Sequence, residues 1–413
     1  MNVKNICTYI AASALAVLVG TVSVSAADQD DPAVMNQIVH GRMLPIAMSA
    51  PLDTGTLLFS DSPEYVTEDG ILYGDRIDGD SRVYFYHVNE SNIPKKVVVV
   101  AYNPSNEPGD IILRGYQYTK PSTSYYIVGK ELSTMYYEGD MAVNRVRVEP
   151  HSYALVGERL NGVAIQPDEL FSGIVDMKLP FPMYISTAMM HMDYDPLTFV
   201  QQQYYLPSDN AKLRGTFRGK DRSLKTLIPY SPKDGVGYIK IGDGIDDRFL
   251  QGRDVMDNRT SENTGNYGVD YSISIRTKGE GKIHMYFNPQ GGEYAGVAEV
   301  IYTDNKGKED KKIIALPREK LSMGLNDPYA IQYVDSFQAG QNVTVHIMPP
   351  GAANLPVRIL LVPDKNLEQA SDAADALKHL QNQAKAEVEA QQQAKEDRAK
   401  IAAQEVRNNK KNS

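Results

Sequence analysis

The chain has 413 residues and a formal net charge of −9, with 43 Lys and Arg against 52 Asp and Glu. This mild acidic excess argues against nucleic acid and anionic lipid surfaces as partners, because both attract basic proteins. The 26 Tyr and the absence of Trp favour half-buried sheet faces, where a phenol ring packs while its hydroxyl stays in water. The length is sufficient for two domains of ordinary size.

Residues 1–26 have the features of a secretory signal peptide. Lys4 supplies the positive charge, residues 10–24 are almost all apolar or small, and the segment ends at Ala26 in the small-x-small pattern VSA. The apolar run is shorter than the roughly 20 residues of a spanning helix. We therefore expect a secreted protein of the extracytoplasmic cell envelope, in the periplasm or at the cell surface. Its mature chain is predicted to have no transmembrane helix and to begin with an N-terminal extension over residues 27–56.

The single cysteine, Cys7, lies inside the predicted signal peptide and before its apolar core. A lipidation cysteine would follow that core. The mature chain is therefore predicted to contain no disulfide, no thiolate metal ligand and no thiol nucleophile. A large domain can bury enough apolar surface to fold without disulfides.

Short β-branched and aromatic segments fill the middle of the chain, separated by turn signals. They cover residues 82–89, 96–102, 110–113, 143–148, 271–275, 282–287, 297–302, 312–316, 342–348 and 357–362. Many short strands with few helical patterns between them are typical of antiparallel sandwiches or barrels. We predict an all-β fold with two tandem antiparallel β-sandwich domains, residues 57–179 and 221–363, and a connector over residues 180–220.

An internal repeat favours two related domains. Residues 82–104 align with residues 267–289 at a constant offset and without a gap. Each copy has the pattern of a hairpin, in which a strand, a polar turn and a second strand end at an Asn-Pro dipeptide. Asn103 is therefore predicted to be equivalent to Asn288. Chance similarity between two hairpins is the alternative explanation.

Strand parity assigns faces to the repeat, because alternate residues of a strand point to opposite sides. Tyr86 and Tyr271 are predicted to be equivalent and buried. The residues expected in the first core are Tyr84, Tyr86, Val88, Val98, Val100 and Tyr102. Those expected in the second core are Val269, Tyr271, Ile273, Ile283, Met285 and Phe287. The residues expected to face outward are His87, His284, Tyr286 and His346.

Residues 364–413 form a tail of different composition, rich in Ala, Gln, Lys and Glu, with no Gly or Pro. That composition favours a single α-helix. Its apolar positions, among them Leu377 and Val388, are too sparse for a regular heptad seam. One interpretation is a solvated helix that contributes little to the fold, and the other is a coiled-coil or envelope-tethering segment.

The sequence contains no recognisable catalytic motif. We find no G-x-S-x-G elbow, P-loop, helix-opening G-x-G-x-x-G or H-E-x-x-H zinc motif. A triad of Ser, His and Asp converges only in space, so scattered residues of these types predict nothing. We therefore predict no catalytic residues, no cofactor and no enzymatic activity.

Three weaker patterns suggest ligands. The acidic clusters Asp75, Asp78, Asp80 and Asp243, Asp246, Asp247, Asp254, Asp257 could supply oxygen ligands to calcium, but neither has EF-hand spacing, and acidic turns are commonly solvated. A soft copper(I) site could use Met183, Met189, Met190, His191 and Met192, with His284 and His346. Strand parity divides the methionines between two faces, and Met is a common core residue, so no metal site is predicted. Exposed Tyr could provide a sugar platform.

Several loop segments are similar to those of a known group of proteins. They are residues 58–64 with 70–73, residues 265–271, residues 288–296 and residues 349–357. Together they resemble an uncharacterised family of secreted, envelope-associated β-sandwich proteins of Firmicutes and their diderm relatives. The resemblance implies an envelope location and carries no catalytic or metal-binding residue to this chain.

These observations lead to one principal prediction and one alternative. The principal prediction is a secreted bacterial cell-envelope structural or adhesive protein without catalytic activity, whose partner is an envelope protein or a cell-wall glycan. The alternative is an extracytoplasmic ligand-binding module for a glycan or a metal. A hydrolase would need two carboxylates or a Ser/His pair in one cleft.

Overall fold

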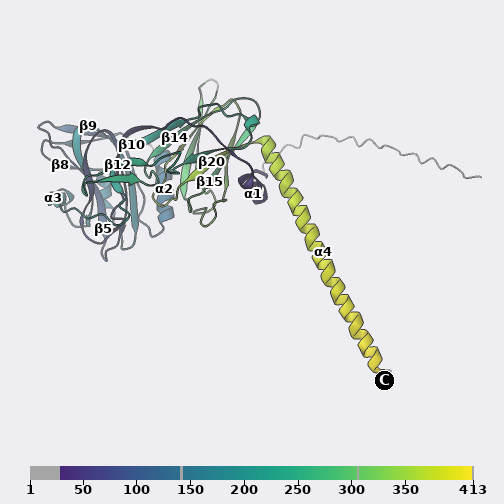
Figure 1. The fold of residues 1–413 in the computed structure, drawn as a ribbon. Coiled ribbons are helices and arrows are strands. Elements are labelled where there is room, and N and C mark those ends of the chain that lie inside the picture. The colour runs from purple at the N-terminus through teal and green to yellow at the C-terminus, as the bar shows by residue number, and fades with distance from the viewer. Residues whose placement is uncertain (1–27, 140–142, 305–306, 412–413) are drawn as a thin grey trace, which may run out of the picture.

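The computed structural model describes residues 28–139, 143–304 and 307–411, with side chains described to residue 396. The predicted signal peptide and Cys7 lie outside the described residues. The described chain is mostly β, with two sheets and a long C-terminal helix that projects from the body (Figure 1). The predicted all-β class and the helical tail are confirmed in this form.

The helical elements are η1 (Asp28–Asp30), α1 (Pro32–His40), α2 (Tyr125–Glu138), η2 (Glu158–Gly162), α3 (Pro196–Val200), η3 (Pro232–Asp234) and α4 (Asp364–Lys411). The strands of the first half are β1 (Leu44–Pro45), β2 (Leu52–Ser60), β3 (Tyr65–Val66), β4 (Gly70–Asn89), β5 (Lys95–Tyr102), β6 (Gly109–Tyr118), β7 (Asn144–Val148), β8 (Tyr153–Val156) and β9 (Leu170–His191). Those of the second half are β10 (Arg214–Lys225), β11 (Gly237–Ile241), β12 (Leu250–Asp254), β13 (Arg259–Asn263), β14 (Asp270–Arg276), β15 (Lys282–Pro289), β16 (Gly296–Thr303), β17 (Glu309–Leu316), β18 (Gln332–Gln338), β19 (Asn342–Ile347) and β20 (Val357–Pro363).

The larger sheet runs through both halves of the chain. Its order is β17-β16-β19-β14-β10-β2-β4-β9-β5-β8, and β2 and β10 form the antiparallel junction between the halves. The smaller sheet has the order β1-β11-β20-β15-β18. Two long strands, β4 and β9, pair along most of their length, with register shifts at residues 71–73 and 77–79 of β4.

The main strand pairings of the first half each have a counterpart of the same direction in the second. The first half contains, in order, the pairs β2–β4, β4–β9, β9–β6, β6–β7, β9–β5 and β5–β8. In the same order, the second half contains β10–β14, then β14–β19 together with β11–β20, then β19–β16, β16–β17, β20–β15 and β15–β18. The long pair β4–β9 therefore corresponds to two shorter pairs. The pairs β2–β4 and β10–β14 are parallel, so the expectation of purely antiparallel sheets is wrong there. Parallel neighbours require a crossover, and in each half the chain passes through other strands before it returns.

The two copies of the sequence repeat are not hairpins. Within the described pairings, β4 does not pair with β5, and β14 does not pair with β15. β4 and β5 both pair with β9, whereas β14 lies in the larger sheet and β15 lies in the smaller one. The strand-turn-strand pattern was correct, but a short turn also allows the chain to step across to another strand or layer.

The first core is formed by the opposite strand face from the one predicted. Val83, Phe85, Val97 and Val99 pack together between the layers. The predicted set Tyr84, Tyr86 and Val88 instead packs with α2 and with the core of the second half. Val98 and Val100 pack beneath α3. The second core follows the prediction, since Tyr271, Ile273, Ile283, Met285 and Phe287 are buried together.

Three of the four side chains expected to face outward are buried. They are His87, His284 and Tyr286, each 1% exposed or less, whereas His346 is partly exposed. Tyr286 is covered by α1 and by the first turns of α4. Further elements of the chain cover the faces that were expected to be in water.

Two helices connect distant parts of the chain. Val128 and Leu132 of α2 pack in the cluster that contains Tyr84 and Tyr86, and α2 also contacts β16 and β17 of the second half. The root of α4 packs on α1, where Leu367, Ala370 and Ala374 are buried. The interpretation of the tail as contributing little to the fold is therefore wrong for its first three turns.

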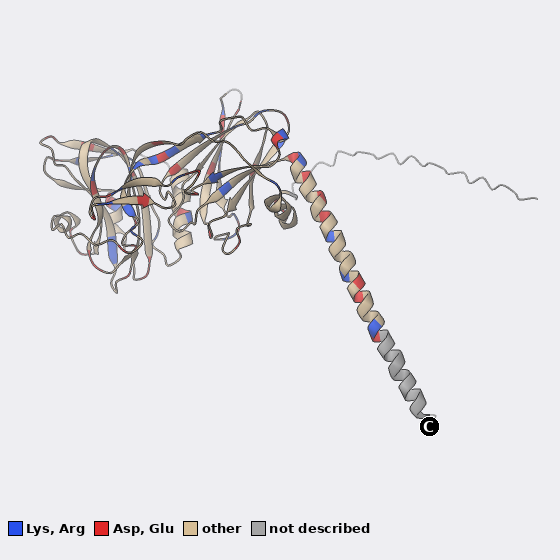
Figure 2. Ribbon diagram, viewed as in Figure 1, with Lys and Arg blue, Asp and Glu red and all other residues tan. Residues whose placement is uncertain are grey.

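Beyond its root and up to residue 396, α4 has charges of both signs on its surface (Figure 2). Leu377, Leu380 and Val388 are exposed along it. In the described part of the chain, no helix is both long enough and apolar enough to cross a membrane. Two strands cross the predicted domain boundaries: β9 spans residue 180 and β10 spans residue 220.

Candidate functional site: a tyrosine groove on the first half

The strand register of the first half places four long side chains in one row. Arg76 of β4 lies opposite Tyr184 of β9, Tyr184 lies opposite Tyr102 of β5, and Tyr102 lies opposite Tyr153 of β8. Directly opposed residues of antiparallel strands project to the same side of a sheet. At about 4.8 Å between strands, the row spans roughly 14 Å.

The central ring of this row, that of Tyr102, contacts the ring on each side of it. The ring centroids of Tyr102 and Tyr153 are 4.6 Å apart with an interplanar angle of 32°, and those of Tyr102 and Tyr184 are 6.2 Å apart. Offset aromatic pairs at such distances are mutually stabilising, so the rings form a pre-organised surface. Tyr184 remains 48% exposed.

Two other segments raise walls beside the row. One follows α3 and brings Gln203 and Tyr205, whose backbone bridges to Ile71 of β4. The other contains Val255 and Met256, in the turn between β12 and β13. The resulting groove has a volume of about 760 Å³ and is widely open to solvent. This volume is within the usual range for small-molecule sites.

The polar groups of the groove are few. Arg76 is exposed, and no hydrogen bond or ion pair joins its guanidinium to another described residue. Asp75 accepts a hydrogen bond from the Arg76 backbone N–H at 2.6 Å. Burial, together with the neighbouring phenols of Tyr102 and Tyr205, raises the pKa of Tyr153. Its hydroxyl therefore stays protonated at neutral pH and available as a hydrogen-bond donor.

The groove suits binding better than hydrolysis. Asp75 is its single lining carboxylate among the described residues. Glycoside hydrolysis ordinarily uses two carboxyl groups that flank the bond to be cleaved. The groove offers phenol rings, hydroxyls and one guanidinium, which are the groups that stack on apolar ring faces and hydrogen-bond to polar substituents.

The acidic clusters serve as partners of buried arginines. Asp247 pairs with Arg222 at 2.6 Å and accepts a hydrogen bond from the Tyr271 hydroxyl at 2.6 Å. Asp254 pairs with Arg214 at 3.0 Å, and both side chains are fully buried. Charge pairing therefore accounts for these acids.

Three other acids of the two clusters also have local partners. Asp243 accepts from the backbone N–H groups of residues 245, 246 and 247. Asp257 pairs with Arg214 and Arg259, and Asp80 pairs with Arg114. Among the described residues, no group of three His, Cys, Asp or Glu is placed to hold a metal ion.

The methionine and histidine residues of the copper hypothesis lie apart. Met183 and Met189 are in the first core, and Met190 packs under α3. His284 is bonded to Asp364 at 2.6 Å, at the start of α4, and His346 lies 3.4 Å from Asp270. These residues belong to separate clusters, so they do not form a joint site.

The tyrosine row was not identified from the sequence. Tyr102 was predicted to face the first core, and its ring lies in the groove. Tyr184 fell in the expected connector and Tyr153 in a segment without a predicted strand. A signal was present, because each of these tyrosines lies in a short β-branched or aromatic run, but the row depends on the register between strands that are far apart in the sequence.

Comparison with known proteins leaves the chain without an assigned family. No protein-family model and no curated protein matches it. Among solved structures, the PBSX exported protein XepA is similar over 72% of this chain and 88% of its own, at 9% identity and a TM-score of 0.15. The 7S globulin of Momordica charantia is similar over 67% and 71%, at 8% identity and a TM-score of 0.11. An oxalate decarboxylase of Bacillus subtilis is similar over 79% of both chains, at 8% identity and a TM-score of 0.11. Such TM-scores establish neither fold nor function.

Proposed function

We propose that this protein is a secreted adhesive protein of the bacterial cell envelope, without catalytic activity, that holds a glycan in the tyrosine groove. The observation that carries the proposal is the row of Tyr184, Tyr102 and Tyr153 on one sheet face, whose rings are in contact in advance of any ligand. Pre-organised rings lose little conformational freedom on binding, which leaves more of the contact energy as affinity. The envelope location rests on the predicted signal peptide.

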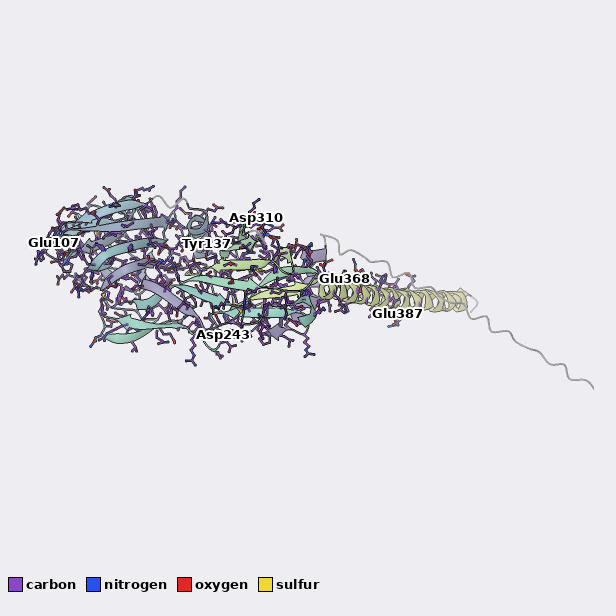
Figure 3. All side chains as sticks on the ribbon, turned by 90° about the horizontal axis from the view of Figure 1, so that it is seen from above. Glu107, Tyr137, Asp243, Asp310, Glu368 and Glu387 are labelled. Atoms are coloured by element: carbon purple, nitrogen blue, oxygen red, sulfur yellow. The ribbon has the colours of Figure 1, made fainter. Side chains whose placement is uncertain are left out.

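The arrangement of the body supports an adhesive function. The groove strands β5 and β8 lie at one end of the body, and α4 leaves from the other end (Figure 1). Figure 3 shows the same arrangement from above, with Glu107, in the loop after β5, far from Glu387 of α4. A ligand in the groove and a partner on the exposed part of α4 would therefore be held on opposite sides of the molecule.

We also propose that the two halves are tandem β-sandwiches of one strand plan that share the larger sheet. The support is the correspondence of their strand pairings, together with the gap-free sequence repeat. Under this proposal the long strands β4 and β9 each run through both layers of the first sandwich. In the second sandwich, two separate strands take the place of each long strand: β14 and β11 replace β4, and β19 and β20 replace β9.

Binding to soluble polysaccharides tests the glycan proposal. The mature chain is run in affinity gels that contain soluble cell-wall glycans, followed by calorimetry with the one that retards it. Tyr184→Ala should weaken binding by roughly 3–10-fold, in line with about 0.5–1.5 kcal/mol for one aromatic contact. Tyr329→Ala is the matched control, because Tyr329 is 51% exposed and belongs to a different cavity. Equal affinity of both variants and wild type would overturn the proposal.

Localisation is tested separately. Cells that produce the full chain are fractionated, and the exported protein is sequenced from its N-terminus. We expect a start within a few residues of Ala27, since the predicted cleavage follows Ala26. An intact Met1 start in the exported fraction would contradict the signal-peptide prediction without affecting the groove.

A further inference from the structure

We propose that the groove selects an acidic polysaccharide, and that Arg76 is the residue that recognises its carboxylates. This inference rests on the proposed glycan-binding function and names the class of ligand. Its physical basis is the position of Arg76 at the end of the tyrosine row, on the same sheet face as Tyr184. An extended chain that stacks on the rings brings its substituents within reach of the guanidinium.

The side chain of Arg76 is available to a ligand, whereas three other arginines of the body are buried. Arg82, Arg214 and Arg222 are each at most 3% exposed and paired with aspartates. The guanidinium of Arg76 has no hydrogen-bond or ion-pair partner among the described residues, and its side chain is exposed. A planar guanidinium with free donors matches the two oxygens of a carboxylate.

Asp75, the neighbour of Arg76 on β4, forms no ion pair with the guanidinium among the described contacts. Asp75 lies opposite Ile185, so strand alternation starts its side chain on the other side of β4 from Arg76, although Asp75 also lines the groove. One of its oxygens already accepts the Arg76 backbone N–H. The row therefore presents three phenol rings and one guanidinium.

The neighbouring rings also strengthen the contact. Tyr184 lies directly opposite Arg76, so a chain that stacks on its ring also covers the neighbouring guanidinium. Charge-assisted hydrogen bonds gain strength as water is displaced. The remainder of the molecule is net acidic, so a polyanion gains nothing from the protein's overall field and must depend on a local cation.

A paired-probe experiment tests the inference on the mature chain. The probes are polygalacturonate and the same polymer after carboxyl reduction, which removes the charge and keeps the sugar backbone. Wild type should bind the acidic polymer about 10-fold more tightly at low salt, and this preference should decrease as salt is added. Arg76→Gln should reduce the preference to less than about 2-fold, because it weakens binding of the acidic polymer more than binding of the neutral one. Arg76→Lys should retain part of the preference.

Control variants separate this inference from the groove proposal. Arg145→Gln makes the same charge change at an exposed site on β7 and should keep the full preference. Tyr184→Ala should weaken binding of both polymers. If wild type binds both polymers equally and Tyr184→Ala weakens both, the role of Arg76 is overturned and the groove proposal stands. Acidic-polymer binding that persists unchanged in Arg76→Gln also overturns the inference, and no binding of either polymer overturns both proposals.

Discussion

Asn103 and Asn288 make the same kind of contact in the two halves of the chain. Both side chains are fully buried, at the end of β5 and near the end of β15. The Asn103 amide donates to the carbonyl of Val148 at 3.1 Å, and the Asn288 amide donates to that of Ala330 at 2.7 Å. Each carbonyl belongs to the segment that leads into the next paired strand, β8 or β18. Each asparagine therefore ties the end of its strand to the segment that precedes the next strand paired with it.

Removing either amide should destabilise the fold by a similar amount. Asn103→Ala and Asn288→Ala each leave buried carbonyls without a donor, which costs about 1–3 kcal/mol. Because the sites share no partner, the two losses should add to within about 0.5 kcal/mol. Urea unfolding measures both. The control Asn92→Ala removes an exposed amide and should change stability by less than about 0.5 kcal/mol. A negligible effect at either buried position would contradict their shared role.

The root of α4 should stabilise the body, and the rest of the helix should not. Leu367 is fully buried against α1, so Leu367→Ala should cost about 2–5 kcal/mol. Leu380→Ala is the control, because that side chain is 63% exposed. Ending the chain after Gln381 should leave the melting midpoint unchanged, whereas ending it after Pro363 should lower it by several degrees. Equal midpoints for the two truncations, measured by calorimetry, would show that the root contributes nothing.

His87 should make stability depend on pH. Burial lowers the pKa of His87 to about 4, against about 6.5 when unfolded, and its ring bonds Ser60 and the Pro63 carbonyl. The unfolded chain binds the proton more readily, so this contribution is complete above pH 6.5 and is lost as pH falls toward 4. The loss amounts to about 3 kcal/mol.

The comparison for His87 uses His87→Gln, which cannot titrate. Wild type should lose more stability than the variant between pH 7 and pH 4.5, as measured by urea unfolding at each pH. Subtracting the unfolding free energy of the variant from that of wild type at each pH cancels the contributions of the other titratable groups. One of these is Asp61, whose pKa is raised because burial favours its protonated form, so its contribution to stability increases as the pH falls. Parallel pH profiles would rule out a contribution from His87.

Arg82 should be essential to the junction of the two halves. Its guanidinium donates to Asp176 of β9 and to the carbonyls of Lys220 and Gly268 in the second half, all within 3.0 Å. Arg82→Met leaves the buried Asp176 without its principal partner, which costs about 3–5 kcal/mol. Adding Asp176→Leu should recover part of this loss, since it removes the unpaired charge. A double variant that is no more stable than the single one would show that the loss comes from the carbonyl contacts.

The sequence alone indicated the general class, many of the strands and the C-terminal helix, but not α2. β-branched and aromatic runs marked most strands, because those residues fit a half-buried pleated surface. The Ala-rich, Gly-free and Pro-free composition after residue 363 determined the long helix. The repeat also marked strands that have corresponding neighbours in the two halves, since equivalent strands require similar patterns of apolar residues.

Only the tertiary structure decided which strand face became the core. Residues 83–88 and 97–101 are apolar or aromatic at nearly every position, so alternation within them does not distinguish inside from outside. Additional layers, α2, α3 and the root of α4, bury the faces that a single sandwich would leave in water. Local sequence carries no information on which distant helix will cover a strand.

The candidate site depended on the tertiary structure in the same way. Arg76, Tyr184, Tyr102 and Tyr153 come from four strands, and their row exists because β9 pairs on one side with β4 and on the other with β5. A shift of one residue in either register would turn a tyrosine to the other face. The sequence shows which residues carry aromatic and charged groups, but the pairing of strands that are distant in the sequence decides which of these residues lie side by side.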